Sequence, residues 1–443
     1  MVDRNPGLSR RQLLLTGAGA LGAAAVGVPL LGGCSPGGVP EDRSRIDFWH
    51  LLSGGDGIKM ASLIDSVNDA NEEFFAWPTV LAWGAPYYTK LSMASAGGRA
   101  PDIAIMHSSR VPGYAPGGLL DPWDLDMLAE VDVTEEQFPG PIWEKGFSDD
   151  SLYAIALDAH PFIMMYNTDI CEQAGVLGSD GQLAEITSPE QFLEVATAIQ
   201  GVTGQHGLSY GYLGDGAQMW RLWYCLYRQH GAEMDLSGET VEYDLDAAVE
   251  SLEFMQQLLD DTIASSSSDY ANAVAEFASG GSGLFFTGVW ELPTMQGAGI
   301  ALDAQTVPTL YGTPAAYGDS HAFVLPHQDN PDPESRRLTY QFMSDILHSS
   351  LSWAEAGHIP GFVPITQSSE YQALVPQAHY ANAAEILNYD PTAWFSGSGS
   401  NFQEYFAEYI QGVLLTGDDP ATGFEAFIER INRLLTMPNP VAG

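Results

Sequence analysis

The chain of 443 residues contains little lysine and little cysteine. It has three lysines, Lys59, Lys90 and Lys145, and its 16 basic residues stand against 57 acidic ones, for a formal net charge of −41. Such an acidic surface repels nucleic acid and anionic lipid headgroups, and it does not attract a phosphorylated or carboxylate ligand from a distance. The composition therefore favours a neutral ligand.

Long apolar runs are absent after residue 33, so no later segment is predicted to span a membrane. Before that point, Arg10 and Arg11 precede a Gly/Ala-rich apolar segment that ends in Leu-Gly-Gly-Cys at 31–34. A twin arginine ahead of a moderately apolar segment is typical of a twin-arginine export signal. The Leu-Gly-Gly-Cys run resembles the lipobox of bacterial lipoproteins, in which the cysteine, here Cys34, carries the lipid. An uncleaved membrane anchor over 13–33 is the alternative.

Residues 1–33 are accordingly predicted to be a signal peptide, and residues 34–41 a lipid-anchored linker. Cleavage leaves 13 basic and 56 acidic residues. The remaining chain is expected on the outer face of the cytoplasmic membrane, held there by Cys34. It is long enough for two domains or for one two-lobed unit.

Two further cysteines, Cys171 and Cys225, lie in segments with a helical pattern. Exported cysteines can form a disulfide, but both positions equally suit small, buried apolar side chains. The sequence does not give the distance between the two Cα atoms, so both interpretations stay open.

Strand and helix patterns alternate along the chain without internal repeats. Residues 46–50 form a short apolar run, followed by the Gly-rich segment 53–57 and by apolar residues at helical spacing over 58–71. Apolar runs at 101–108 and 153–157 predict two more strands. This alternation predicts an α/β fold with a largely parallel sheet.

Ligands of such sheets gather outside the carboxyl ends of the strands. Polar and aromatic residues follow the predicted strands at six positions: Trp49, His50, His107, Ser108, Asp158 and His160. Their convergence at one edge predicts a single binding site.

Several short segments carry a resemblance to a known family. They are the Phe-Trp-His run at 48–50, the stretch 101–120, the Met-Tyr-Asn-Thr-Asp run at 165–169 and the stretch 284–292. The tail 414–432 is similar to the last helical pair of the same family. In their order and spacing these segments resemble the extracellular solute-binding proteins (family 1) of sugar-importing ABC transporters.

The resemblance implies the two-lobed periplasmic-binding-protein fold of type II, with ligand held in a cleft between lobes that close around it. The crossings between the lobes are expected near 157–160, 308–318 and 353–364. The first lobe would combine 42–157 with 315–355, and the second 158–312 with 356–443. Closure would present a docking surface to the permease.

A sugar offers C–H patches that stack on aromatic rings and hydroxyls that need planar polar partners. The candidate platforms are Trp49, Trp220, Trp290 and Trp394, although a tryptophan more often packs in a core. Trp290 is the first choice, because it follows Gly288, where the missing Cβ allows a close approach. The matching tryptophan of the family lies in the cleft.

The polar candidates lie at strand ends, in the Gly-rich segment and on the later crossings. Several have structural alternatives: Asp158 and His160 suit a turn, Arg110 an ion pair, and Glu291 and Asp56 a helix cap. The polar ligand-binding candidates are His50, Asp56, His107, Ser108, Arg110, Asp158, His160, Glu291, Ser320, His321 and His358.

Other classes of function have weaker support. Asp158 with Glu291 would be a conceivable glycosidase pair, but the chain has no Gly-x-Ser-x-Gly elbow, and we do not expect an enzyme. The ten histidines occur without His-x-x-x-His spacing, so no metal site is expected. The Gly-rich segment lacks the Lys-Ser/Thr of a P-loop, which argues against nucleotide hydrolysis.

We therefore expect a substrate-binding lipoprotein without cofactor that delivers a neutral mono- or oligosaccharide to an ABC permease. A receptor for glycerol phosphodiesters or polyols is the closest alternative, and a secreted carbohydrate-active enzyme is a second one. A monomer is the default expectation.

Overall fold

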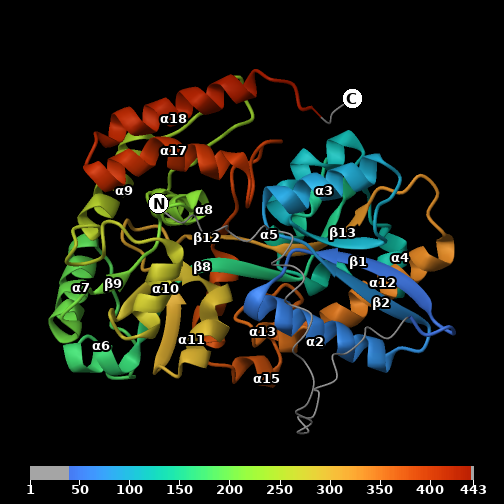
Figure 1. Cartoon of the computed structure of the whole chain (residues 1–443), viewed down its shortest axis with the longest axis horizontal. Coiled ribbons are helices and arrows are strands. Elements are labelled where there is room, and N and C mark those ends of the chain that lie inside the picture. Colours follow the sequence, from blue (N-terminus) through green and yellow to red (C-terminus); the bar gives the residue numbers. More distant parts are fainter. Residues whose placement is uncertain (1–38, 441–443) are drawn as a thin grey trace, which may run out of the picture. The chain divides into compact units, whose positions relative to one another are not determined.

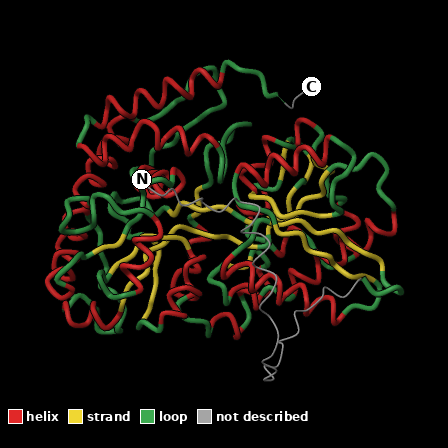
Figure 2. The backbone as a smooth tube through the Cα atoms, viewed as in Figure 1, coloured by secondary structure: helices red, strands yellow, loops and turns green. Residues whose placement is uncertain are grey.

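The computed structural model describes residues 39–440 of the chain. The predicted signal peptide and Cys34, the predicted site of lipid attachment, lie outside the described residues. From Glu41 onward the chain forms one compact unit. Two large sheets, each accompanied by helices, make up this unit (Figures 1 and 2).

The first sheet is built mainly from the N-terminal part of the chain. Its strands are β1 (Ser44–His50), β2 (Phe74–Val80), β3 (Ile103–His107), β4 (Leu120–Asp121), β7 (Ala154–Ala156) and β13 (His321–Pro326). Their order is β2-β1-β3-β13-β4, with β7 also paired to β13. Strand β1 is parallel to β2 and β3, whereas β13 is antiparallel to its neighbours. A separate hairpin joins β5 (Phe147–Ser148) and β6 (Ser151–Leu152).

The second sheet is organised around one long strand. Its strands are β8 (Asp158–Asn167), β9 (Leu208–Ser209), β10 (Leu284–Gly288), β11 (Leu302–Thr306), β12 (Ala316–Asp319), β14 (Ile359–Pro360) and β15 (Leu387–Asn388). Strand β8 pairs antiparallel with β10, β11, β12 and β14. The expectation of a largely parallel sheet is therefore wrong for this half, because hydropathy patterns do not carry strand direction.

Helices surround both sheets. Those accompanying the first sheet are α2 (Gly54–Ala70), α3 (Ala85–Ala96), η1 (Ser108–Gly113), η2 (Ala115–Gly117), α4 (Leu125–Glu130), η3 (Glu135–Gln137), α5 (Gly140–Glu144), α12 (Pro333–His348), α13 (Leu351–Ala354), α14 (Val363–Thr366) and α15 (Ser369–Gln372). Those accompanying the second are α6 (Thr168–Ala174), α7 (Pro189–Thr203), α8 (Gly216–Gln229), α9 (Leu245–Leu258), α10 (Tyr270–Ala278), η4 (Val289–Glu291), α11 (Leu292–Ala298), α16 (Gln377–Tyr380), η5 (Ala381–Glu385), α17 (Asn401–Thr416) and α18 (Pro420–Leu435). Figure 1 shows α17 and α18 side by side, as the predicted final helical pair requires.

Strands β3, β8, β10 and β13 are buried at every position, which explains their continuous apolar runs. In β8, Phe162 and Met164 face one core, while Ile163 and Met165 face another on the opposite side of the sheet. All four side chains are fully buried. Successive side chains of a strand alternate between its faces, so one apolar run supplies two cores.

The predicted helix over 58–71 is confirmed, with an earlier start than expected. Helix α2 begins at Gly54 and packs Met60, Leu63 and Ile64 into the core beside the first sheet. The Gly-rich segment is thus the first turn of the helix rather than a loop. The N–H groups of a first turn have no partner within the helix and remain available to other groups.

Strand pairing shows where the chain passes from one sheet to the other. The first change, between β7 and β8, occurs at Leu157, so Asp158 and His160 begin a strand instead of following one. The next change, between β12 and β13, occurs at Ser320, later than the predicted 308–318. Strand β12, which we expected in the first lobe, accordingly pairs with β8. The two strands are consecutive, so hydropathy gives no sign of a break between them.

The third crossing also differs from its predicted bounds. Strand β14 pairs with the start of β8, yet Phe362, expected in the second lobe, is buried in the core of the first sheet. This segment therefore returns to the first core after touching the second sheet.

Cys171 and Cys225 are both buried and unpaired, which excludes the disulfide and leaves the apolar interpretation. Burial raises the thiol pKa of each to about 12. Within residues 39–440, no helix combines the length and apolar character that a membrane span requires.

Candidate functional site

A cavity of about 420 Å³ is lined by residues of both sheets and of the segments that join them. Its lining residues are Leu51, Leu52, Ser53, Gly54, Gly55, Asp56, Trp83, His107, His160, Asp215, Gln218, Arg221, Tyr270, Trp290, Glu291, Thr294 and His321. A mixed lining of apolar, aromatic and convergent polar groups is typical of a small-molecule site. We refer to this cavity as the pocket.

One side of the pocket is an aromatic wall formed by Trp290, Tyr270, Glu291 and Arg221. The Trp290 indole Nε1 donates to the Tyr270 hydroxyl at 2.8 Å, and that hydroxyl donates to Glu291 Oε1 at 2.5 Å. The Arg221 guanidinium lies 4.6 Å from the centre of the indole, a cation–π contact. A Cβ at Gly288 would overlap the indole, so the missing side chain is what admits the ring. The hydrogen bond to Tyr270 therefore fixes the edge of the indole, and the Arg221 guanidinium covers part of one face.

Trp83 also lines the pocket and is 44% exposed. It follows β2 and precedes α3. Its ring offers a second aromatic surface to a ligand.

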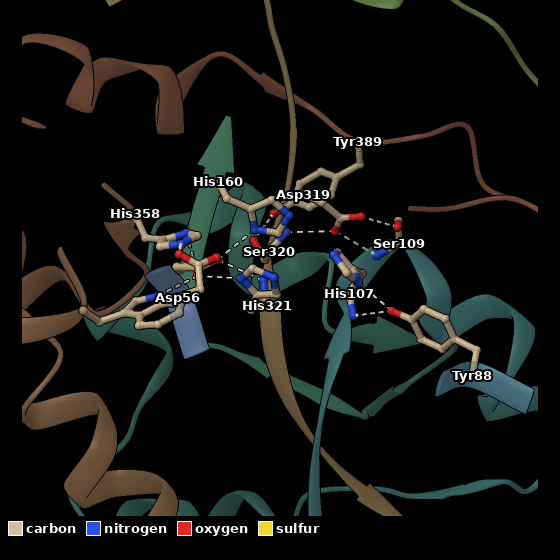
Figure 3. A network of polar contacts seen from close by, with 12 residues as sticks. Asp56, Tyr88, His107, Ser109, His160, Asp319, Ser320, His321, His358 and Tyr389 are labelled. Atoms are coloured by element: carbon tan, nitrogen blue, oxygen red, sulfur yellow. Dashed lines mark hydrogen bonds and ion pairs between the residues drawn. The ribbon is translucent and has the colours of Figure 1, made fainter. Parts of the chain in front are cut away.

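The floor of the pocket contains two stacked histidines, His160 and His321. Their ring centres lie 4.1 Å apart, and His107 lies 5.3 Å from His160 and 5.0 Å from His321 (Figure 3). His107 Nδ1 is 2.5 Å from the Tyr88 hydroxyl. Burial first, and then the neighbouring His321, lowers the pKa of His160 to about 3, so this ring is neutral at pH 7.

Asp158 lies beneath that floor and is fully buried. Its Oδ1 accepts from His160 Nδ1 at 3.0 Å and from the His321 backbone N–H at 2.9 Å. Its Oδ2 accepts from His321 Nδ1 at 2.9 Å and from Trp353 Nε1 at 2.7 Å. Burial raises the pKa of this carboxyl, but His321 and His358 outweigh it and hold the pKa well below its usual value.

His358 joins Asp158 to Asp56. Its Nδ1 lies 3.3 Å from Asp158 Oδ2, and its Nε2 lies 3.1 Å from Asp56 Oδ1. Burial lowers the pKa of His358, but the two carboxylates more than compensate and raise it. The ring stacks on Trp353 at 4.4 Å. Gly357, with a φ of 101°, leaves room for the backbone of Val289 where a side chain would overlap it.

One grouping bears on the expectation that the chain has no metal site. Asp158, His160, His321 and His358 each offer one ligand atom, and these four atoms lie within 4.8 Å of one another. We call this group the histidine cluster. The four residues come from three segments far apart in the chain, so residue spacing could not predict that they meet.

The predicted site residues fall into three groups. Six line the pocket: Asp56, His107, His160, Trp290, Glu291 and His321. Two lie beneath its floor: Asp158 and His358. Seven are elsewhere: Trp49, His50, Ser108, Arg110, Trp220, Ser320 and Trp394.

The tryptophans outside the pocket have packing roles. Trp220 is fully buried and packs edge-on against Phe402, because α8 is surrounded by protein on nearly all sides. Trp394 packs edge-on against Phe395. Trp49 lies under the Lys90 ammonium, 5.2 Å from the ring centre.

The polar candidates outside the pocket are held by neighbours. The Arg110 guanidinium covers the Tyr88 ring at 4.5 Å and donates to the Ser396 carbonyl, so it makes a cation–π contact in place of the ion pair that was the alternative. The Ser320 hydroxyl is 2.8 Å from that of Tyr389, and the Ser108 N–H donates to the Ser320 carbonyl. His50 is buried beside Phe48, and burial lowers its pKa to about 4.

Sequence reasoning missed several polar lining residues, above all those of α8. Asp215 caps this helix by accepting from the N–H groups of Ala217 and Gln218. Gln218 and Arg221 follow three and six residues after the cap and lie on one face of the helix. An N-cap followed by a rare arginine within an apolar helix was the available signal. Trp83, Tyr270 and Thr294 carried no comparable signal.

Comparison with known proteins identifies the family of this chain. Residues 85–386 match the family model of the bacterial extracellular solute-binding proteins. No curated protein sequence matches the chain.

Solved structures agree in fold at low sequence identity. The cyclic α-maltosyl-1,6-maltose binding protein of Arthrobacter globiformis has a TM-score of 0.70 at 18% identity, over 89% of this chain and 99% of that one. Maltose-bound MalE3 of T. maritima has 0.73 at 13% identity, over 88% and 100%. UgpB of Mycobacterium tuberculosis, in complex with glycerophosphocholine, has 0.74 at 16% identity, over 88% and 98%. The expected two-lobed binding-protein fold is thereby confirmed, and the chain belongs to the bacterial extracellular solute-binding protein family.

Proposed function

We propose that this chain captures a neutral sugar outside the cell and delivers it to the permease of an ABC transporter. The observation that carries the proposal is the pocket itself, in which aromatic rings and planar polar groups surround one cavity. Rings suit the C–H faces of a sugar, and carboxylates, imidazoles and a guanidinium suit its hydroxyls. Structural neighbours that bind maltose and a cyclic maltosyl-maltose support the same ligand class.

The charge of the pocket favours a neutral ligand over an anionic one. The carboxylates of Asp56, Asp215 and Glu291 line the same cavity as Arg221. A phosphodiester would meet these three carboxylates as well as the one guanidinium, which disfavours it. The glycerophosphocholine complex of UgpB keeps this ligand class as the alternative to test.

A binding role suits these residues better than catalysis. Asp158 is fully buried and does not line the pocket, so it cannot act with Glu291 as a pair of carboxylates flanking a glycosidic bond. Glu291 in turn accepts from the Tyr270 hydroxyl.

We further propose that export follows the twin-arginine signal and that lipid on Cys34 tethers a monomer to the outer face of the membrane. The two halves of the pocket would close on the sugar, and the closed form would dock on the permease. Hinge residues would lie at the sheet changes, Leu157 and Ser320.

A thermal-shift screen of the chain from Ser35 onward tests the ligand class. The panel contains glucose, maltose, maltotriose, glycerol and glycerophosphocholine, because a ligand that binds the native state raises the unfolding midpoint. A shift with a neutral sugar supports the proposal. A shift with glycerophosphocholine alone overturns the sugar assignment and keeps the receptor role. Recovery of the unchanged sugar after incubation separates a receptor from a hydrolase.

A further inference from the structure

The histidine cluster has a composition and a burial that the pocket does not require. Asp158 and His358 are fully buried, and His160 and His321 are each 5% exposed. Asp158 and His160 begin β8, His321 begins β13, and His358 directly precedes β14. The cluster therefore lies where all three sheet-joining segments meet.

The ligand atoms of the cluster are close enough to surround one metal ion, since all four lie within 4.8 Å of one another. The His160 Nδ1 lies 3.0 Å from Asp158 Oδ1, and the Nδ1 atoms of His321 and His358 lie 2.9 and 3.3 Å from Asp158 Oδ2. Ligand bonds of about 2.0–2.2 Å place neighbouring donors of a tetrahedral zinc site about 3.4 Å apart. Three imidazoles and one carboxylate are a donor set that suits zinc and its neighbours in the transition series.

His358 supplies a second, independent observation. Its ring is fully buried, and its nitrogens contact only the carboxylates of Asp158 and Asp56, at 3.3 and 3.1 Å, without the geometry of a hydrogen bond. A metal ion on Nδ1 would give this buried nitrogen a directed bond in place of a misaligned contact. With Nδ1 on a metal ion, the Nε2–H would point toward Asp56, the carboxylate–histidine–metal arrangement that orients many metal ligands.

The charges of Asp56 and Asp158 also favour a bound cation. Among the described residues, the ion-pair partners of Asp56 and Asp158 are histidines alone, with no lysine or arginine. Two carboxylates in such a site are neutralised by one divalent cation. The bonds from Trp353 and from the His321 backbone to Asp158 would remain as outer support for the carboxylate.

We propose that Asp158, His160, His321 and His358 bind one divalent transition-metal ion, with zinc as the best fit. The ion would join the three sheet-joining segments beneath the pocket floor. It would also fix the rings of His160 and His321, which line the pocket. The site does not depend on the identity of the pocket's ligand.

Metal content tests the proposal directly. The chain from Ser35 onward is purified, its affinity tag is removed, and the protein is stripped with EDTA, incubated with zinc sulfate and dialysed. We expect about one zinc ion per chain by mass spectrometry and a raised unfolding midpoint. Cobalt in place of zinc is expected to give the visible absorption of a tetrahedral site. Zinc below about 0.1 per chain and an unchanged midpoint would overturn the proposal, leaving Asp158 with its hydrogen bonds from His160, His321 and Trp353.

Matched histidine variants locate the ion. His358→Gln and His321→Gln are expected to lose the bound zinc and the cobalt spectrum. His379→Gln removes an imidazole that pairs with Asp303 outside the cluster, and it is expected to keep both. If His358→Gln does not fold, as circular dichroism will show, His321→Gln provides the test. Zinc retained by a folded cluster variant at the level of the unmodified chain would place the ion elsewhere and overturn the assignment.

Discussion

The aromatic wall and the histidine cluster meet in one pocket, but they are built in opposite ways. In the wall, Tyr270 connects Trp290 to Glu291, and all three groups remain partly exposed. In the cluster, one buried carboxylate accepts bonds from two histidines and from Trp353. The wall offers surface to a ligand, whereas the cluster holds together the segments that carry the pocket.

This difference predicts different consequences of mutation. Residues of the wall contribute to ligand affinity more than to folding, because their side chains border the cavity. Asp158 and its partners contribute to folding, because removal of one partner leaves buried charge or unpaired donors. Each of the following experiments sharpens this contrast or contradicts it.

The largest effect is expected for Asp158→Asn. The amide cannot accept from all the donors that surround the carboxylate, so the free energy of unfolding should fall by about 3–5 kcal/mol. Urea unfolding in the presence of EDTA measures this loss apart from any metal. Asp121→Asn is the matched control, since Asp121 also contacts a histidine, His327 at 2.7 Å, but is partly exposed. Equal losses at the two positions would contradict the special role of the cluster.

Trp290→Ala should weaken sugar binding by about 30–100-fold, or about 2–3 kcal/mol, with little loss of stability. The change removes the ring and also releases Tyr270 and Arg221 from their present positions. Titration calorimetry with the sugar that shifts the unfolding midpoint gives the dissociation constant. Trp77→Ala is the control, because Trp77 is partly exposed on β2 and does not line the pocket. Unchanged affinity in Trp290→Ala would remove the wall from the binding site.

Trp83→Ala should weaken binding by about fivefold, since one aromatic stacking contact contributes about 1 kcal/mol. Its exposed ring has no comparable partners to release, so the stability should remain unchanged. The same calorimetric titration measures the dissociation constant of this variant. An effect larger than that of Trp290→Ala would show that Trp83 provides the main stacking surface.

The smallest effect concerns pH and a buried carboxyl that does not line the pocket. Burial raises the pKa of Asp390, against hydrogen bonds from Tyr317 and Gln403 that lower it. The folded pKa is above the unfolded value near 4, so the native state binds this proton more tightly. The unmodified chain should gain stability relative to Asp390→Asn as the pH falls from 7 towards 4. Unfolding free energies of both proteins at pH 7 and pH 5 check the direction, and a difference that does not change with pH would contradict it.

The sequence predicted the α/β class, the two-lobed fold and the helix that became α2. It also led to six residues that line the pocket. Trp290 is the clearest of these, because Gly288 beside it marked a close approach of the backbone, and the indole occupies that space. Trp220 does not line the pocket as predicted, because the presence of a tryptophan does not distinguish a ligand-stacking ring from one packed in a core.

What the sequence determined by itself is local: apolar periods, the presence of a helix and the short motifs of a family. These properties depend on residues close together in the chain. Only the tertiary structure decided the direction of the strands, the sheet changes at Leu157 and Ser320, and the meeting of four ligating groups from three distant segments. The reason is physical, since a contact such as that of Asp158 with His358 spans about two hundred residues and exists only when both sheets have formed and paired.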